Sequence, residues 1–246
     1  RGRGRLMFTG SSVPVAHTLL IAERFGPTLQ GEGPSTGQQA LFIRLSRCNL
    51  TCPACDTAYS WDWSRFDPAA EASRLPVDEL VDWVLASSTR LVVITGGEPL
   101  LQQPGLVGLV RALADARRRV EIETNGTHVP SPELIEAVAQ FTVSPKLSTF
   151  GAGMGEARRI NAAALRGFMS GGKSVFKFVI TTPADLVEIT ELERRFGLSP
   201  VWVMPEGTTR AAVLSGMSWL AEEALTRGWH LSGRLHVLLW GDERGR

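Results

Sequence analysis

The sequence predicts an α/β fold, a partial (β/α) barrel of mostly parallel strands. Two patterns indicate this fold. Short β-rich runs alternate along the chain with stretches in which apolar residues recur every three or four positions, as on one face of a helix. The β-rich runs are almost continuously apolar, which is typical of strands that are covered on both faces. Alternating strands and helices form βαβ units, and such units build a parallel sheet.

Residues 18–246 are expected to form one domain, because no repeat, low-complexity block or linker interrupts them. The run TLLIAERF at 18–25 predicts a strand near an edge of the sheet. Further strands are expected at 40–46, 91–95, 120–124, 141–145, 175–181, 201–205 and 235–240. Helices are expected at 77–87, 105–118, 132–140, 183–196 and 212–225. The glycine-rich stretch 151–173 is expected to form either a mobile lid or an added helix.

Polar motifs follow several of the expected strands directly. GGEP (96–99) follows the strand at 91–95, Asn125-Gly126 follows 120–124, and comparable motifs follow two later strands. In a parallel, TIM-like barrel the C-terminal ends of the strands form the rim on which active sites are built. Turn chemistry would explain Gly, Pro and Asn after any one strand. Their recurrence, together with a cysteine-rich loop, favours an active site.

Composition and charge argue against several classes of protein. The formal net charge is +1, so no nucleic-acid partner is expected. No apolar run approaches the roughly 20 residues that a membrane helix needs, so no membrane partner is expected. Residues 1–17 are basic and rich in Gly and Ser, and they are expected to be a disordered tail rather than a secretory signal. A disulfide framework is excluded because all three cysteines lie in one loop, which favours the reducing cytoplasm.

The three cysteines, Cys48, Cys52 and Cys55, have the spacing Cys-x3-Cys-x2-Cys. A structural zinc site needs four ligands, and none of the four histidines is close in sequence or has the paired spacing of a zinc finger. Three thiolates suit a [4Fe-4S] cluster whose fourth iron stays open to a small molecule. A zinc-binding interaction module without catalysis is the alternative from a different class of protein.

The cysteine spacing, followed by TGGEP at 95–99, resembles the radical S-adenosylmethionine (SAM) superfamily. The resemblance implies a radical SAM fold in which SAM chelates the open iron, and an electron from the cluster then releases a 5′-deoxyadenosyl radical. No side chain is therefore assigned a catalytic role. Lys146 is one of only three lysines in the chain, which supports its use in a site. The resemblance assigns SAM contacts to Ala54, Cys55, Asp56, Gly97, Glu98, Asn125, Ser144, Pro145 and Lys146.

The flanking motifs TLQGEG, CDT, ETNG and SPK are similar to those of the 7-carboxy-7-deazaguanine synthase family, in the same order, from about residue 18 to 240. The resemblance implies conversion of 6-carboxy-5,6,7,8-tetrahydropterin to 7-carboxy-7-deazaguanine with release of ammonia. SAM would be regenerated in each cycle. The pathway would be 7-deazapurine biosynthesis of the queuosine type, which leads to modified tRNA or to a natural product. The resemblance also implies magnesium, a homodimer and an electron donor such as flavodoxin or ferredoxin.

The same resemblance assigns the substrate pocket. Thr57 would help to hold magnesium, and Glu32 would accept hydrogen bonds from the N–H edge of the pterin. For Arg44 an internal ion pair is the alternative to the substrate carboxylate, and for His236 a buried structural role is equally consistent. Trp61 and Trp63 either shield the cluster or pack the loop. The full set of expected substrate contacts is Leu29, Gln30, Gly31, Glu32, Arg44, Thr95 and His236.

A glycyl-radical enzyme activase is the alternative within the radical enzymes. Such activases share the cysteine spacing and a small barrel. Nothing in their chemistry requires TLQGEG at 28–33 or CDT at 55–57, which favours the synthase. No second cysteine group is present for an auxiliary iron–sulfur centre.

Overall fold

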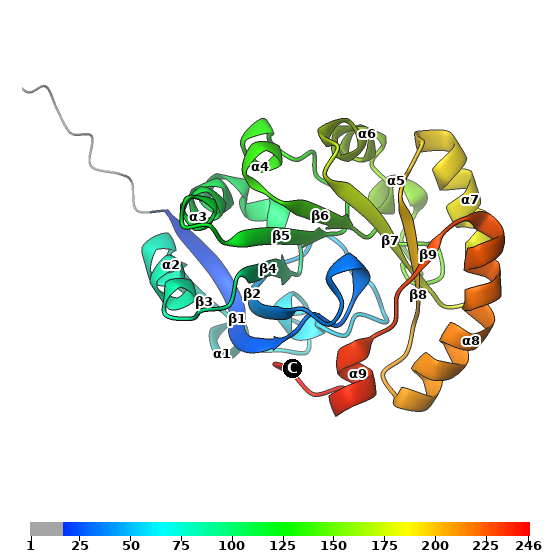
Figure 1. Ribbon diagram of the computed structural model, residues 1–246, viewed down its shortest axis with the longest axis horizontal. Helices are drawn as coiled ribbons and strands as arrows, with labels where there is room; N and C mark the ends of the chain where they lie inside the picture. Colours follow the sequence, from blue (N-terminus) through cyan, green and yellow to red (C-terminus); the bar gives the residue numbers. More distant parts are fainter. Residues whose placement is uncertain (1–16) are drawn as a thin grey trace, which may run out of the picture.

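The computed structural model describes residues 17–246, and these form a nine-stranded sheet in the order β3-β1-β2-β4-β5-β6-β7-β8-β9. The expected tail, 1–17, lies outside the described residues except for His17, whose carbonyl accepts a hydrogen bond from the Val77 amide at 3.0 Å. Figure 1 shows the sheet curving into an open barrel whose inner face is turned toward the end of the chain. The parallel, partly closed barrel that the sequence predicted is confirmed.

Two kinds of strand pairing build the sheet. β1 (Thr18–Leu29) is antiparallel to both of its neighbours, β2 (Gln39–Leu45) and β3 (Ser73–Pro76). From β2 onward every pair is parallel, so the C-terminal ends of these strands meet at one rim. The remaining strands are β4 (Leu91–Gly96), β5 (Arg119–Thr124), β6 (Gln140–Val143), β7 (Ser174–Ile180), β8 (Val201–Pro205) and β9 (His230–Leu231).

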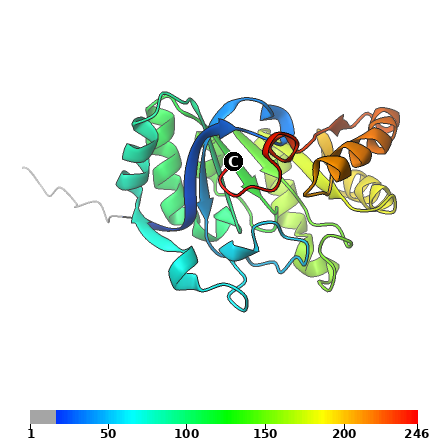
Figure 2. The ribbon, with the colours of Figure 1, turned by 90° about the horizontal axis from the view of Figure 1, so that it is seen from below.

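The larger helices cover the outer face of the sheet, whereas α9 lies on the inner side beside the chain end (Figure 1). Figure 2 shows the same arrangement from below, with the chain end over the open side of the barrel. The helices are α1 (Pro68–Glu71), α2 (Val77–Leu85), α3 (Gln103–Asp115), α4 (Pro132–Ala137), α5 (Glu156–Arg159), α6 (Ala162–Gly171), α7 (Asp185–Phe196), α8 (Arg210–Arg227) and α9 (Leu235–Trp240). Three short 3-10 turns are η1 (Gly33–Ser35), η2 (Ala58–Ser60) and η3 (Pro99–Gln102).

The two faces of the strands differ in chemistry. Outward-facing residues such as Ile94 and Phe141 are buried against the helices, and the Phe141 ring packs on Phe168 with centroids 5.2 Å apart. Toward the inside, polar side chains such as Glu123 and Lys177 line a cavity. Because side chains alternate along a strand, one apolar run can hold the core on one side and carry a functional group on the other.

The last expected strand, 235–240, is wrong: this segment is helix α9. β9 is the edge strand and pairs with β8, and residues 235–240 do not add a further strand beside it. Leu235 instead donates its amide to the Gly31 carbonyl at 2.8 Å, and the following turn buries Val237. The stretch 151–173 contains α5 and α6, so it adds helices to the barrel.

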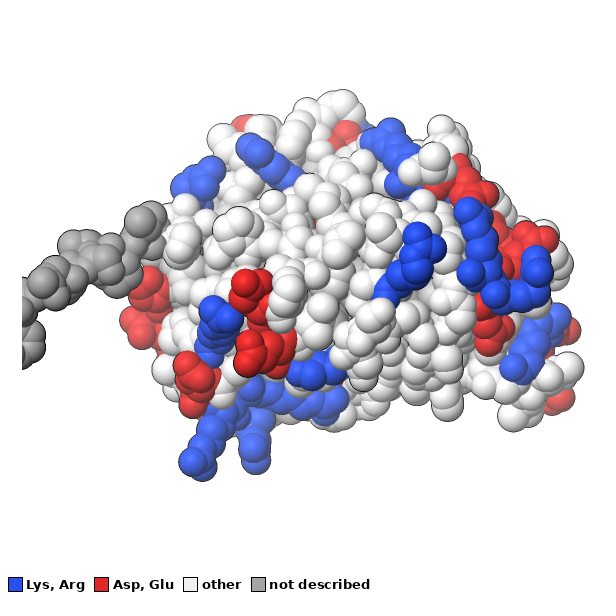
Figure 3. Space-filling view, turned by 90° about the horizontal axis from the view of Figure 1, so that it is seen from above, with Lys and Arg blue, Asp and Glu red and all other residues white. Residues whose placement is uncertain are grey.

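Basic and acidic side chains lie next to one another at both ends of the face shown in Figure 3, with mostly uncharged residues between. No helix among residues 17–246 has both the length and the apolar character needed to span a bilayer.

Replacing Phe141 by alanine tests the packing of the outer layer. Phe141 is 1% exposed, so Phe141→Ala is expected to lower the free energy of unfolding by roughly 3–5 kcal/mol. Urea denaturation followed by circular dichroism measures this change. Leu225→Ala is the control, because Leu225 is 74% exposed and its loss should change stability by less than about 0.5 kcal/mol. Equal effects of the two changes would contradict the layer arrangement.

Candidate active site

A cavity of about 610 Å³ opens at the C-terminal rim of the parallel strands. Its walls come from β1, β2 and β4 to β8, from the cysteine loop and from α9. Two of the residues that the sequence assigned to the site, Glu98 and Pro145, are not on its walls. The assigned residues that line it are Leu29, Gln30, Gly31, Glu32, Arg44, Cys48, Cys52, Ala54, Cys55, Asp56, Thr57, Thr95, Gly97, Asn125, Ser144, Lys146 and His236.

The cysteine loop leaves the end of β2 and holds three free thiols at the cavity wall. Cys52 is buried with Leu50 and Met154, and Cys48 packs against this group. Burial raises the pKa of Cys48 to about 12, and it also raises that of Cys52. Thiolates there need a cation to stabilise them. Within residues 17–246 no three His, Cys, Asp or Glu side chains, the cysteines included, converge closely enough to hold a single metal ion. The three cysteines line the cavity wall as free thiols, and three thiolates are a donor set whose chemistry suits an iron–sulfur cluster.

Hydrogen-bond donors lie next to two of the three cysteine sulfurs, those of Cys48 and Cys55. The Leu50 amide donates to the Cys48 Sγ atom at 3.4 Å, and the Asn125 Nδ2 atom lies 3.8 Å from the same sulfur. The Trp61 indole Nε1 donates to the Cys55 Sγ atom at 3.3 Å. Such donors stabilise the negative charge of thiolate ligands.

The glycines of the GGEP motif join the loop after β4 to the loop after β2. Gly97 donates its amide to the Leu45 carbonyl at 3.1 Å, and the Glu98 amide donates to the Arg47 carbonyl at 2.8 Å. A Cβ atom on Gly97 would lie 2.1 Å from the Arg47 carbonyl oxygen. Only glycine permits this approach, so the motif fixes where the cysteine loop starts.

Glu98 lies behind the cavity wall. Its Oε1 atom accepts from the Thr124 hydroxyl at 2.7 Å and from the Leu100 amide at 3.0 Å, and its Oε2 atom accepts from the Asn125 amide at 2.7 Å. Burial raises the pKa of Glu98. The carboxylate thus orients Asn125, which does line the cavity, and its direct contact with SAM stays a prediction.

The SPK motif continues from β6 into the cavity. The Lys146 Nζ atom donates to the Ser144 hydroxyl at 3.0 Å and lies 5.2 Å from the centroid of the Phe150 ring. Arg159, from α5, donates to the Lys146 carbonyl at 2.5 Å and to the Met154 carbonyl at 3.1 Å. The added helix α5 therefore holds the loop that presents Lys146.

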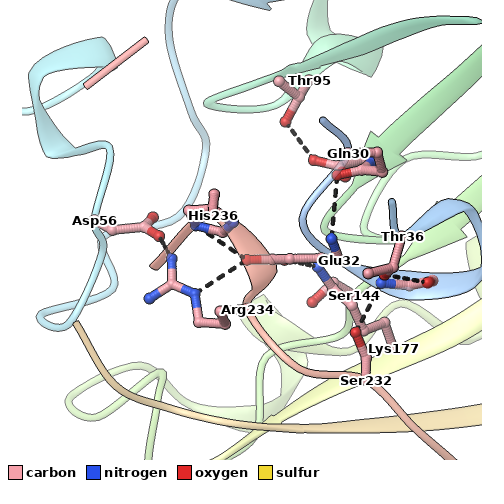
Figure 4. Close-up of polar contacts among 12 residues, drawn as sticks. Gln30, Glu32, Thr36, Asp56, Thr95, Ser144, Lys177, Ser232, Arg234 and His236 are labelled. Atoms are coloured by element: carbon pink, nitrogen blue, oxygen red, sulfur yellow. Dashed lines mark hydrogen bonds and ion pairs between the residues drawn. The ribbon is translucent and has the colours of Figure 1, made fainter. Parts of the chain in front are cut away.

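Glu32 is the centre of a cluster of charged side chains that also line the cavity. Its carboxylate contacts the Lys177 ammonium, and the Arg234 Nε atom donates to its Oε1 atom at 3.1 Å (Figure 4). The His236 Nε2 atom lies 4.0 Å from the same oxygen. Burial acts to raise the pKa of Glu32, but the charges of Lys177 and Arg234 outweigh it and hold that pKa well below its ordinary value.

Arg234 connects the loop that carries Glu32 with the cysteine loop. Besides Glu32, its guanidinium contacts Asp56, the residue after Cys55, and donates to the Gly207 carbonyl at 2.8 Å. The sequence analysis did not single out Arg234 or Lys177. A signal for Lys177 was available, because it is a lone charge within the apolar run VFKFVIT. Arg234 has no such signal, since its role arises from folding of the chain end onto the rim.

Arg44 forms the internal ion pair that was the alternative to substrate binding. Its Nε atom donates to the Glu23 Oε1 atom at 2.7 Å, and Glu23 also accepts from the Tyr59 hydroxyl at 2.5 Å. Arg44 nevertheless lines the cavity, and its two terminal nitrogens make no hydrogen bond to another residue of the described part of the chain. Arg244, in the chain-end segment WGDERGR, donates to Glu23 at 2.9 Å and lies 3.8 Å from the Tyr59 ring centroid.

Glu123 is a second carboxylate that the sequence analysis did not assign to the site. Its Oε1 atom accepts from the Gln30 amide group at 3.1 Å, and its Oε2 atom accepts from the Thr95 hydroxyl at 2.8 Å. It projects into the cavity from β5. Gln30 and Thr95, both assigned to substrate, are therefore oriented by one carboxylate between them.

Comparison with known proteins gives consistent results. A family model described as the Radical SAM superfamily matches residues 42–151. A 7-carboxy-7-deazaguanine synthase of Pyrobaculum aerophilum is 36% identical, with 89% of this chain and 94% of that protein covered. One from Halobacterium salinarum is 35% identical over 87% of this chain and 88% of its own length. The crystal structure of QueE from Escherichia coli has a TM-score of 0.67 and 27% identity, covering 87% of this chain and 93% of that one.

Gly97→Ala tests the contact between the two loops. The new methyl group would overlap the Arg47 carbonyl, so the loops must separate, at a cost of more than about 2 kcal/mol in stability. Iron content after anaerobic reconstitution is expected to fall several-fold, as measured by a colorimetric iron assay. Gly108→Ala is the matched control, because nothing lies within 4 Å of a Cβ atom there. Normal iron content in Gly97→Ala would contradict the loop argument.

Glu32→Gln tests the charged cluster. At pH 7 the variant is expected to lose about 2 kcal/mol of stability, between the values for exposed and buried pairs. Since the pKa of Glu32 lies far below 4.5, the wild-type advantage is complete above pH 4.5 and shrinks as the pH falls below it.

Urea denaturation of both proteins at several pH values between 7 and 3 measures the difference. The control is Glu79→Gln, which removes an ion pair with Arg24. The Glu79 side chain is 46% exposed. This control should change stability by less than about 1 kcal/mol at any of these pH values. A wild-type advantage over Glu32→Gln that stays constant from pH 7 to 3 would refute the ionic explanation.

Proposed function

The chain belongs to the 7-carboxy-7-deazaguanine synthase family of radical SAM enzymes, and on this premise we propose how its cavity performs that reaction. The substrate is the pterin 6-carboxy-5,6,7,8-tetrahydropterin, and the product is 7-carboxy-7-deazaguanine. The observation that carries the function is the similarity to 7-carboxy-7-deazaguanine synthases over nearly the whole chain. The residues that we propose for each role lie around one cavity.

Cys48, Cys52 and Cys55 would hold the [4Fe-4S] cluster. With three ligands from the chain, one iron stays open to the amino and carboxylate groups of SAM. When bound, the cluster and SAM supply the radical that abstracts hydrogen from the substrate and later returns it. The donor set supports this assignment, because three free thiols line the wall next to the polar groups of the rim.

SAM would lie between the cysteine loop and the ends of β4 to β6. Ser144 and Lys146 offer a hydroxyl and an ammonium beside each other, 3.0 Å apart, and Asn125 projects next to Cys48. Gly97 leaves room for the ligand at the wall because it has no side chain. These residues would thereby orient SAM, while Glu98 holds Asn125 in place from behind.

The pterin would lie between Glu32 and Arg44. Arg44 lines the cavity, and its two terminal nitrogens make no hydrogen bond within residues 17–246; their fork matches the planar carboxylate of the substrate. Glu32 stays ionised because Lys177 and Arg234 lower its pKa, so it can accept hydrogen bonds from the guanidine-like edge of the pterin. Lys177 and Arg234 balance its charge from within the protein.

Thr57 would help to bind magnesium, which takes its remaining ligands from substrate oxygens and water. Its hydroxyl lies 3.6 Å from the Cys55 Sγ atom and lines the cavity. Magnesium there would orient the substrate carboxylate and stabilise charge as the ring contracts.

We propose three further features of this enzyme on the basis of its family. It forms a homodimer, it receives electrons from flavodoxin or ferredoxin, and it acts in the cytoplasm. Its product enters 7-deazapurine biosynthesis of the queuosine type, which leads to modified tRNA or to a natural product.

The first experiment is mass spectrometry of one anaerobic reaction. The reconstituted, dithionite-reduced protein is mixed with SAM, magnesium and 6-carboxytetrahydropterin. We expect 7-carboxy-7-deazaguanine to form without stoichiometric loss of SAM, and we expect a slower rate without magnesium.

Two variants test the residues that we propose for the cluster and for the substrate carboxylate. Cys55→Ala should form no product, and Arg44→Lys should raise KM for the pterin by roughly tenfold or more, since lysine cannot form the paired contact. If 5′-deoxyadenosine forms but the pterin remains intact, the radical chemistry stands and the substrate assignment fails. A protein that binds zinc and forms neither compound would be the interaction module instead.

A further inference from the structure

Trp61 and Trp63 lie two residues apart after the cysteine loop, yet the structure places their indole groups differently. The Trp61 Nε1–H group donates to the Cys55 Sγ atom at 3.3 Å, and Trp61 lines the cavity. The Trp63 indole donates no hydrogen bond to another residue within 17–246, and Trp63 is not on the cavity wall. The two tryptophans therefore have different relations to the sulfur ligands.

The position of Trp61 is set by the turn that follows Cys55. The Thr57 carbonyl accepts from the Ser60 amide at 2.9 Å, and the Trp61 amide donates to the Ala58 carbonyl at 3.0 Å. This 3-10 turn, η2, brings the indole back toward the cysteine six residues earlier. The turn is held at its base, because the Arg47 amide donates to the Ser60 carbonyl at 2.7 Å. The indole is thus directed at the sulfur by a fixed backbone.

A hydrogen bond to a ligand sulfur affects the reduced and oxidised states of a cluster unequally. Reduction adds one electron, and part of its charge lies on the sulfurs, so a donor stabilises the reduced state more strongly. An indole N–H is suited to this role, because it donates and keeps its proton in both states. The net effect is a higher reduction potential, which makes electron transfer from the donor easier.

We propose that Trp61 is a positioning residue that raises the reduction potential of the cluster through the hydrogen bond from its indole to the Cys55 sulfur. The couple transfers one electron from an external reductant to the cluster, and no bond or proton of Trp61 changes. This inference rests on the proposed function, since it requires the cluster to be bound at Cys48, Cys52 and Cys55.

The test is a redox titration of the reconstituted holoenzyme without SAM, with dithionite as reductant and the EPR signal of the reduced cluster as readout. Trp61→Phe keeps the aromatic ring and removes the N–H donor. We expect its equilibrium constant for reduction to fall about tenfold, which is a shift of about 59 mV to lower potential for one electron. Trp63→Phe is the matched control and should leave the potential unchanged.

The outcomes separate this inference from the function itself. A wild-type protein without the EPR signal of a [4Fe-4S] cluster would refute the proposed function. A normal wild-type cluster with equal potentials in wild type and Trp61→Phe would overturn the role of Trp61. Faster loss of the cluster in air by Trp61→Phe would not change this conclusion. It would indicate only that Trp61 shields the cluster from oxygen.

If Trp61→Phe fails to hold a cluster, a second measurement tests the hydrogen bond in proteins that keep Trp61. Wild type and Trp63→Phe, both labelled with ¹⁵N at the indole, are compared by pulsed electron–nuclear double resonance in the reduced state. An indole ¹⁵N coupling and an exchangeable proton coupling in both proteins would support the hydrogen bond. Their absence from wild type, or loss of the ¹⁵N coupling in Trp63→Phe, would overturn it.

Discussion

The interaction on which the site depends is the contact of Arg234 with two carboxylates at once. Glu32 comes from the loop after β1, Asp56 comes from the cysteine loop, and Arg234 comes from the chain end. These segments are far apart in sequence, and at the rim of the sheet one guanidinium holds them together. Arg234 and Glu32 are largely buried, so breaking their contact leaves uncompensated charge away from water, whereas the contact with the exposed Asp56 costs less to break. The substrate side and the cluster side of the cavity are therefore positioned relative to each other by the same side chain.

The cysteine loop is positioned by backbone contacts rather than by its own sequence. Gly97 brings the loop after β4 against the Arg47 carbonyl, and the Glu98 amide donates to that same carbonyl. The Glu98 carboxylate then reaches the Asn125 amide at the end of the next strand. A short motif thus connects three consecutive strand ends, which explains why glycines and a carboxylate occur together there.

The inner face of the barrel carries charge that must be balanced within the protein. Lys177 is 6% exposed and pairs with Glu32, while Glu123 accepts from Gln30 and Thr95. Each buried charged group thus has a partner, as its desolvation requires. Arg44, which lines the cavity, pairs with Glu23 through its Nε atom, and its two terminal nitrogens make no hydrogen bond within residues 17–246 and are left for a ligand.

The sequence by itself determined the parallel barrel, the cysteine loop as the cluster site and about half of the residues that line the cavity. Apolar runs of strand length and fixed motifs are local features, and the rule that parallel strands end at one rim brings their motifs together. The sequence did not determine that 235–240 is a helix, that Glu98 lies behind the wall, or that Arg234 joins the two loops. Each of these depends on what lies next to the residue in space: β9 occupies the sheet edge, Asn125 takes the carboxylate of Glu98, and Asp56 lies within reach of Arg234. Such contacts join residues that are distant in sequence, so only the tertiary structure decided them.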